Sequence, residues 1–205
     1  MIRICAVQPG FRGSGKNVFI AEQNPILMHH FITSNRHKVE EIKRMTTLPI
    51  KQNQLSYPEI QADTLEAVAE YGIKFCYAHM EAPCFLEDSG LFIDALSGFP
   101  GVYSQYVFKT IGCQGILRLL NEKREAHFKS VIAYCDDHGI ALFSGEIRGM
   151  IAKTEKGKKG FGFDPIFIPE GEKKTFAQMD TEEKNLYSHR GKAFKTFIKY
   201  IEQVR

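Results

Sequence analysis

Two successive carboxylates, Glu87 and Asp88, follow the apolar run 84–86 and precede Ser89 and Gly90. The apolar run predicts a short buried strand, so the carboxylates would lie at its carboxyl end, where open α/β sheets bind ligands. A carboxylate in that position can hold a hard cation or take a proton from water. The alternative is an ordinary polar junction between a strand and a turn.

A second polar stretch follows the strand-like residues 31–33. Apolar residues three apart, Val39, Ile42 and Met45, predict a helix whose first turn contains this stretch. Free backbone N–H groups and the positive dipole end of a helix favour phosphate, and Lys38 adds a full charge. A capped helix with a surface lysine is the alternative. The residues concerned are Thr33, Ser34, Asn35, Arg36, His37 and Lys38.

Two further stretches suit a nucleotide. In the first, glycines would let the backbone approach a ligand and two aromatics could stack on a base. In the second, basic and hydroxyl side chains near a helix start suit an anion or an oxo-purine edge. The alternatives are a glycine-rich hairpin with core phenylalanines and a helix cap with solvated charge. The stretches are Gly160, Phe161, Gly162, Phe163, Asp164 and Pro165, and Lys184 with Ser188, His189, Arg190, Gly191 and Lys192.

Residues 10–16 match the G-x-x-x-x-G-K pattern of a phosphate loop that ends in Lys16. A working loop needs a hydroxyl residue next, to hold magnesium, and then a helix. Here Asn17 follows, and the residues after it, 18–20, are strand-like. The segment 1–27 is therefore predicted to be a flexible extension, with Met28 as a hypothetical natural start.

The elements that must position these residues follow from hydrophobic periodicity. Helices are predicted at 64–80, around 116–120, and at the C-terminus with Phe194, Phe197, Ile198 and Ile201 on one face. Extended segments are predicted at 50–57, 84–86, 128–135 and 140–151, with turns at 98–101 and 136–139. Strands alternate with helices early and cluster later, which predicts an α/β class with a mixed sheet.

The composition excludes several classes of protein. The chain has 205 residues, 43% hydrophobic and 25% charged, which are globular values and exclude disorder. No run approaches the roughly 18–20 apolar residues of a transmembrane helix. Lys and Arg number 27 and Asp and Glu 24, and the resulting net charge of +3 argues against a nucleic-acid or membrane partner.

The cysteines are odd in number and lack zinc-type spacing. This pattern is typical of buried free thiols in a reducing cytosol. They are Cys5, Cys76, Cys84, Cys113 and Cys135.

Taken together and in this order, the motifs resemble those of the inosine triphosphate pyrophosphatase family, also called the Ham1 family. The resemblance runs from about His29 to the C-terminus. The first 27 residues depart from it, as does Phe163, where the family often has another aromatic. The matching residues are Thr33-Ser34-Asn35 with Lys38, Pro58-Glu59, Glu87-Asp88-Ser89-Gly90-Leu91, Phe99-Pro100-Gly101, Phe161-Gly162-Phe163-Asp164-Pro165, and Ser188-His189-Arg190 with Lys184.

The resemblance implies an elongated, two-lobed α/β fold with a mixed sheet and the active site in the cleft between the lobes. Residues 28–205 would form this single domain, usually as a cytoplasmic homodimer without a nucleic-acid or membrane partner. The implied reaction is the Mg²⁺-dependent hydrolysis of ITP, dITP and XTP to the nucleoside monophosphate and pyrophosphate.

The resemblance also implies roles for individual residues. Asp88 would act as general base, and Glu59, Glu87 and Asp88 would hold the metal. Ser89 would contact the phosphates or the sugar, and Phe163 would stack on the base. The other substrate-binding residues would be Thr33, Ser34, Asn35, Arg36, His37, Lys38, Phe161, Gly162, Asp164, Lys184, His189 and Arg190.

Two other functions remain open from the sequence. A P-loop phosphotransferase using Lys16 would release inorganic phosphate instead of pyrophosphate. A non-enzymatic nucleic-acid binder using the lysines of segment 153–159 would show steep salt-dependent binding without turnover.

Overall fold

The computed structural model describes residues 28–204, which form one six-stranded sheet in the order β2-β1-β3-β4-β5-β6. β1 is parallel to β2 and β3, whereas the β3–β4, β4–β5 and β5–β6 pairs are antiparallel. The predicted α/β class with a mixed sheet is confirmed. The strands are β1 (His29–Ile32), β2 (Ile50–Asn53), β3 (Cys84–Ile93), β4 (Glu125–Asp136), β5 (Gly139–Ile151) and β6 (Phe167–Pro169).

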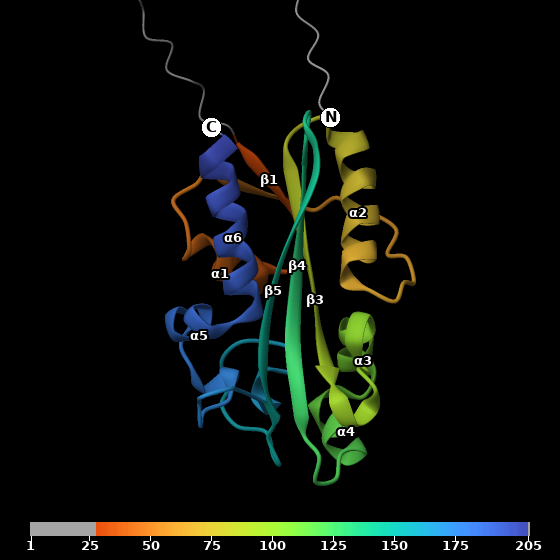
Figure 1. The fold of residues 1–205 in the computed structure, drawn as a ribbon, viewed down its shortest axis with the longest axis vertical. Coiled ribbons are helices and arrows are strands. Elements are labelled where there is room, and N and C mark those ends of the chain that lie inside the picture. Colours follow the sequence, from red (N-terminus) through yellow and green to blue (C-terminus); the bar gives the residue numbers. More distant parts are fainter. Residues whose placement is uncertain (1–27, 205) are drawn as a thin grey trace, which may run out of the picture.

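Helices cover both faces of the sheet (Figure 1). In the view of Figure 1, α1, α5 and α6 lie on one side of the long strands and α2, α3 and α4 on the other. No helix within residues 28–204 has the length and apolar character needed to cross a membrane. The helices are α1 (Arg36–Lys43), α2 (Leu65–Met80), α3 (Ser104–Thr110), α4 (Gly112–Leu119), α5 (Thr181–Tyr187) and α6 (His189–Val204).

Three hydrophobic clusters hold this arrangement together. One includes Phe194 and Phe197 of α6 with Phe85 of β3, and a second packs α2 against β3 and β4. The third lies farther along the sheet, where the end of β3 and parts of β4 and β5 meet α3, α4 and segment 163–179. The long β4–β5 hairpin carries residues of all three clusters, which gives the molecule its elongated shape (Figure 1).

The predictions from periodicity were mostly confirmed. The helix predicted at 64–80 is α2, which begins after Thr64, whose side chain accepts a hydrogen bond from the Ala67 N–H. The two predicted late strands are β4 and β5, each slightly longer than expected. Three short elements were missed, α3, α5 and β6, because segments of three to seven residues show too little periodicity to identify.

One prediction was wrong. β3 does not end at residue 86 but continues to Ile93, paired with β4 throughout. Its pairing with β1 does end at Leu86, where β1 gives way to α1. Glu87 and Asp88 therefore lie in the middle of a strand, beside the carboxyl end of β1 instead of at the end of their own strand.

Candidate functional site

The structure contains a cavity of about 660 Å³, a volume suited to a small-molecule ligand. It is formed by the β1–α1 junction, β3, α3, segment 161–164 and the residues around the start of α6. Of the predicted site residues only Arg36, the exposed first residue of α1, does not line it. The predicted residues that do are Thr33, Ser34, Asn35, His37, Lys38, Glu59, Glu87, Asp88, Ser89, Phe161, Gly162, Phe163, Asp164, Lys184, His189 and Arg190.

The start of α1 contributes charge more than free backbone donors. Asn35 Oδ1 accepts hydrogen bonds from the backbone N–H groups of His37 and Lys38, at 3.0 and 3.3 Å. The Asn35 N–H in turn donates to Thr33 Oγ1. Two of the N–H groups that a phosphate could have used are thus occupied, and the cation of Lys38 becomes the main attraction for an anion at this end.

Glu87 is already occupied by cations. Its Oε2 lies 2.8 Å from Lys38 Nζ and 3.3 Å from Arg190 Nε, and Oε1 accepts a hydrogen bond from Ser130. Burial alone would raise the pKa of Glu87, but the charges of Arg190 and Lys38 outweigh it and hold that pKa well below its usual range. Glu87 therefore anchors two cations, an arrangement that does not favour its predicted role as a metal ligand.

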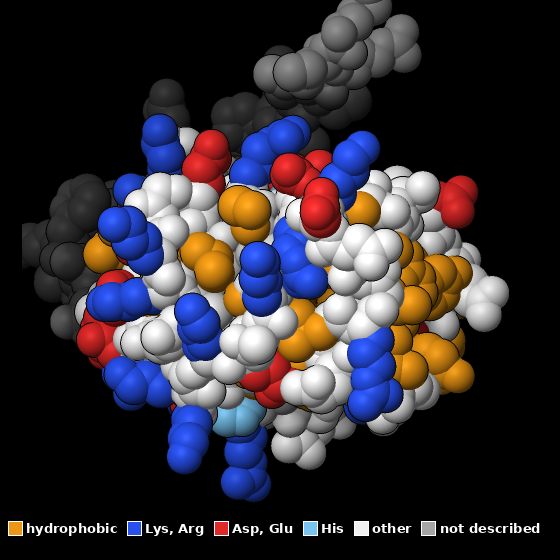
Figure 2. Space-filling model, turned by 90° about the horizontal axis from the view of Figure 1, so that it is seen from below, with side chains coloured by type: hydrophobic (Ala, Val, Ile, Leu, Met, Phe, Trp, Pro, Cys, Tyr) orange, Lys and Arg blue, Asp and Glu red, His pale blue; other side chains and the backbone are white. Residues whose placement is uncertain are grey.

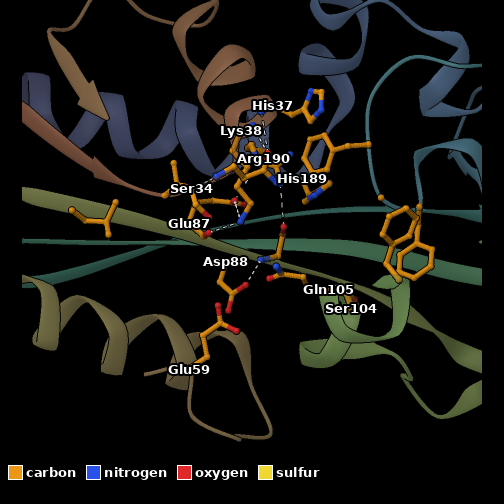
Figure 3. Close-up of a pocket in the computed structure, with 18 of the residues that line it drawn as sticks. Ser34, His37, Lys38, Glu59, Glu87, Asp88, Ser104, Gln105, His189 and Arg190 are labelled. Carbon is orange, nitrogen blue, oxygen red and sulfur yellow. Dashed lines mark hydrogen bonds and ion pairs between the residues drawn. The ribbon is translucent and has the colours of Figure 1, made fainter. Parts of the chain in front are cut away.

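Asp88 has the opposite environment. Burial raises the pKa of Asp88 to about 6; Glu87 and Glu59 act in the same direction, while Lys38 opposes them. Its Oδ1 accepts a hydrogen bond from the Ser89 N–H at 2.9 Å. Figure 3 shows the exposed Glu59 side chain directed toward Asp88. Lys38, the cation that opposes this rise in pKa, is itself paired with Glu87.

The opposite end of the cavity is a buried ionic network. Lys184 Nζ donates to Glu41 Oε1 at 2.7 Å and to Asp164 Oδ2 at 2.6 Å. Arg190 donates to Glu41 Oε2 at 2.6 Å and to Ser89 Oγ at 3.1 Å. Both cations and both acids are at most 5% exposed. Each carboxylate oxygen of Glu41 holds one cation, so this residue sets the spacing between Lys184 and Arg190.

The glycine-rich segment is fitted to this network. Asp164 Oδ2 also accepts the backbone N–H of Phe161, at 2.8 Å. A Cβ at Gly160, where φ is +73°, would lie 2.1 Å from the same oxygen, so only glycine lets the loop close here. The Phe161 ring then lies under both cations, 4.9 Å from Lys184 Nζ and 5.2 Å from Arg190 Cζ.

The two phenylalanines of this segment differ in exposure. Phe163 is 3% exposed and packs edge-on against Phe108, with ring centroids 5.3 Å apart, as part of the third cluster. Phe161 is half-buried and lies beside the cations. The burial of Phe163 disfavours the predicted stacking on a base, and Phe161 is the better placed ring.

His189 is held flat within the same end of the cavity. Its ring stacks on Phe128 with centroids 4.6 Å apart and planes 9° from parallel. Burial, followed by the charge of Arg190, lowers the pKa of His189 well below its ordinary value. The imidazole is therefore neutral near pH 7, with one nitrogen as donor and one as acceptor.

Sequence reasoning missed Glu41 and the α3 residues of the cavity. Glu41 is buried in α1 together with the apolar Val39 and Ile42, and an acid next to an apolar position of a helix is the signal that could have revealed it. Nothing in the sequence marked α3. Its residues at the cavity are Ser104, Gln105, Phe108 and Lys109.

Comparison with known proteins places the chain among a set of relatives. The model of the Ham1 family matches residues 29–200. A dITP/XTP pyrophosphatase of Thermococcus kodakarensis is 56% identical over 178 residues, covering 84% of this chain and 96% of the relative. One from Hyperthermus butylicus is 47% identical, covering 83% and 93%.

Solved structures agree with these matches. The structure of a Ham1 protein from Coxiella burnetii superposes with a TM-score of 0.76 at 30% identity, covering 86% of this chain and 99% of the other. The matched residues 29–200 include each cavity motif. This chain therefore belongs to the Ham1 family.

Proposed function

We propose that this protein hydrolyses triphosphates of deaminated purine nucleosides, ITP, dITP and XTP, to the monophosphate and pyrophosphate. The observation that carries this proposal is the position of Asp88. Its carboxylate lines the same cavity as Lys38, which suits phosphates, and as Phe161 and Arg190, which suit a base. The relatives named as dITP/XTP pyrophosphatases support the substrate class.

In the proposed reaction Asp88 accepts a proton from the attacking water. The water oxygen forms a bond to the α-phosphorus, the bond from that phosphorus to the bridging oxygen breaks, and pyrophosphate leaves. Lys38, whose Nζ is partly exposed and anchored on Glu87, binds and orients the phosphates. Ser89, held by Arg190, would contact the phosphates or the sugar.

The carboxylates fit a magnesium ion. Asp88 and Glu59 offer oxygen donors, and the raised pKa of Asp88 reflects burial beside other negative charges. Within residues 28–204 no group of three potential ligands among His, Cys, Asp and Glu is assembled, so waters and substrate oxygens would complete the shell, as is usual for magnesium. When bound, the ion would neutralise phosphate charge and stabilise the leaving pyrophosphate.

The end of the cavity with Phe161, Lys184, His189 and Arg190, here called the base end, can distinguish purines by the groups on the edge of the base. Hypoxanthine and xanthine carry a 6-oxo acceptor, which Lys184, His189 or the backbone after Phe161 could meet with a donor, whereas adenine presents an amino group there. A buried donor left facing another donor costs about 1–3 kcal/mol, or roughly 5- to 150-fold. Guanine shares the 6-oxo group, so a further group must oppose its 2-amino group. Arg190 is our candidate for it.

The test is to incubate the protein with ITP and magnesium and to identify the phosphate product. Pyrophosphate is expected. The values of kcat/KM for ITP, XTP, GTP and ATP are then compared at one magnesium concentration, with ITP and XTP expected to exceed the other two. Equal values for ITP and GTP would contradict the assigned substrate class even if pyrophosphate were released.

The same product assay separates the rival functions. Lys16 lies outside the described residues. Lys16→Ala should leave ITP hydrolysis unchanged. Loss of ITP hydrolysis in a folded Lys16→Ala variant would favour a phosphotransferase. Lys and Arg side chains are spread over the lower end among acidic ones instead of forming one stripe (Figure 2). A nucleic-acid binder would show no turnover of ITP.

We also propose that the protein acts as a cytoplasmic homodimer and that residues 28–205 form one domain of two lobes. Cys76, Cys84, Cys113 and Cys135 are free and buried, which suits a reducing compartment. Hydrophobic side chains gather on the side of α3 and α4, a surface suited to a second copy (Figure 2). Light scattering should then give twice the chain mass of 23.3 kDa.

A further inference from the structure

The Phe161 ring stacks on an exposed neighbour, His37. The two rings stack with centroids 5.4 Å apart and planes 14° from parallel. The His37 side chain is 59% exposed, and its ring nitrogen lies 3.9 Å from the exposed Glu40. Its backbone N–H is held by Asn35 Oδ1. The backbone is thus fixed by the helix cap, while the imidazole can change rotamer at little cost.

The other neighbours of Phe161 cannot move in this way. Lys184 and Arg190 are both buried and are held by the carboxylate of Glu41. Figure 3 shows His37 at the same end of the cavity as His189 and Arg190. A ligand that needs a face of the Phe161 ring can therefore gain it by displacing His37, whereas displacing a cation would break buried ion pairs.

We propose that His37 and Phe161 form an aromatic clamp for the purine, with the base entering between the two rings. One contact between rings is then replaced by two contacts between a ring and the base. Every base has a π face, so such stacking adds affinity for all purines and does not depend on the hydrogen-bond donors and acceptors on the edge of the base. This inference rests on the proposed function, because it takes the ligand to be a purine nucleotide.

The clamp assigns His37 to the base, although its position in the first turn of α1 suggested the phosphates. The two assignments predict different effects. A stacking residue changes the affinity for every purine nucleotide by the same factor and leaves pyrophosphate binding unchanged. A phosphate contact changes the affinity for pyrophosphate as well.

The experiment compares His37→Ala, His37→Phe and a matched control, His79→Ala. His79 of α2 also stacks on a phenylalanine, Phe75, with centroids 4.1 Å apart, but it does not line the cavity. For each variant we would measure kcat and KM with ITP and GTP, the inhibition constant of pyrophosphate, and the Kd of inosine monophosphate by calorimetry.

His37→Ala should raise KM for ITP and GTP, and Kd for inosine monophosphate, by the same factor of roughly 5–20, within the range of one base–aromatic stack. The kcat and the inhibition by pyrophosphate should change less than about twofold. His37→Phe should restore wild-type values, since a phenyl ring also stacks, and His79→Ala should match the wild type.

Three results would overturn the clamp. An unchanged KM in His37→Ala would mean that the imidazole does not contact the base, and a lowered KM would mean that it blocks the base site. A parallel loss of pyrophosphate inhibition would place the ring at the phosphates. Failure of His37→Phe to restore affinity would exclude stacking. The calorimetry needs no turnover, so a wild type that released no pyrophosphate from ITP would end the proposed function while the clamp was judged separately.

Discussion

The two ends of the cavity differ in how completely their charges are paired. At the base end, the buried Lys184 contacts Glu41 and Asp164, and the buried Arg190 contacts Glu41, Glu87 and Ser89. At the catalytic end, the carboxylates of Asp88 and Glu59 lie toward each other, and Lys38, the cation that opposes the rise in the pKa of Asp88, is paired with Glu87 instead. The charges of the base end are paired within the protein, whereas those of the catalytic end would be balanced by a bound cation and a substrate.

This difference has a physical basis in what each end must do. A pocket that distinguishes oxo from amino groups needs donors that cannot turn to meet the wrong partner, and buried ion pairs hold them in place. A general base needs a pKa close to the working pH, which burial beside other carboxylates provides. The comparison predicts that changes at the catalytic end reduce turnover, whereas changes at the base end reduce selectivity and stability.

The largest effect is expected at Asp88. Asp88→Asn keeps the shape of the side chain but removes the proton acceptor and a candidate metal ligand, so kcat should fall by roughly 10²- to 10⁴-fold. Nucleotide binding, measured by calorimetry with ITP, should remain. Turnover within a factor of about three of the wild type would show that another group acts as the base.

A smaller effect on catalysis, with a clear effect on stability, is expected at Glu41. Glu41→Gln removes the charge that holds two buried cations, and breaking a buried pair costs about 3–5 kcal/mol of the free energy of unfolding. We expect a loss near the lower limit, because the amide can still accept one hydrogen bond. The preference for ITP over ATP should fall by about tenfold, the effect of roughly one hydrogen bond.

The neighbouring Glu40 is the control for this change, because its side chain is 69% exposed on the same helix. Glu40→Gln should alter the free energy of unfolding by less than about 0.5 kcal/mol. Urea denaturation and the ratio of kcat/KM values for ITP and ATP measure the two effects. Equal behaviour of the two variants would mean that Glu41 does not position the base-end cations.

The most gradual effect is expected from pH. In the proposed reaction Asp88 can accept a proton only when it is deprotonated, and burial raises its pKa to about 6. The value of kcat/KM should therefore be constant above about pH 7 and fall about tenfold per unit below pH 6. His189, whose pKa is well below 6.5, should contribute nothing to this fall in kcat/KM at low pH.

Profiles of kcat/KM against pH at several magnesium concentrations sharpen this test. A cation bound to Asp88 would lower its pKa and so move the fall in kcat/KM to lower pH. The residual activity of Asp88→Asn should show no such fall. A fall that persisted unchanged in this variant would have to come from another group.

Several features of the fold were accessible from sequence because their signals are local. The α2 helix repeats apolar residues at helical spacing after a Thr64 cap, and β4 and β5 are long strands joined by a turn. The end of β3 was not accessible, because the chain continues with Asp88 and Gly90, residue types that are depleted in strands. Pairing with β4 overrides that preference, and no local signal reports it.

The cavity residues divide in the same way. Motif order along the chain identified Lys38, Asp88, Phe161 and Arg190 as one site, and the fold brings them to one cavity. Motif order did not identify Glu41, because an acid on a short helix looks like a surface residue. Its partners lie 143 and 149 positions later in the chain.

The sequence by itself therefore determined which chemical groups this protein has and, where the signals are local, which elements carry them. Helix caps, periodicity and the residue types of the motifs depend on neighbours along the chain. Only the tertiary structure decided which carboxylate is neutralised and which is left to act: Glu87 and Asp88 are adjacent, yet the first contacts Arg190 and Lys38 while the second lies toward Glu59. Strand pleating sends adjacent side chains to opposite faces of a sheet, and the elements packed on those faces set the pKa of each.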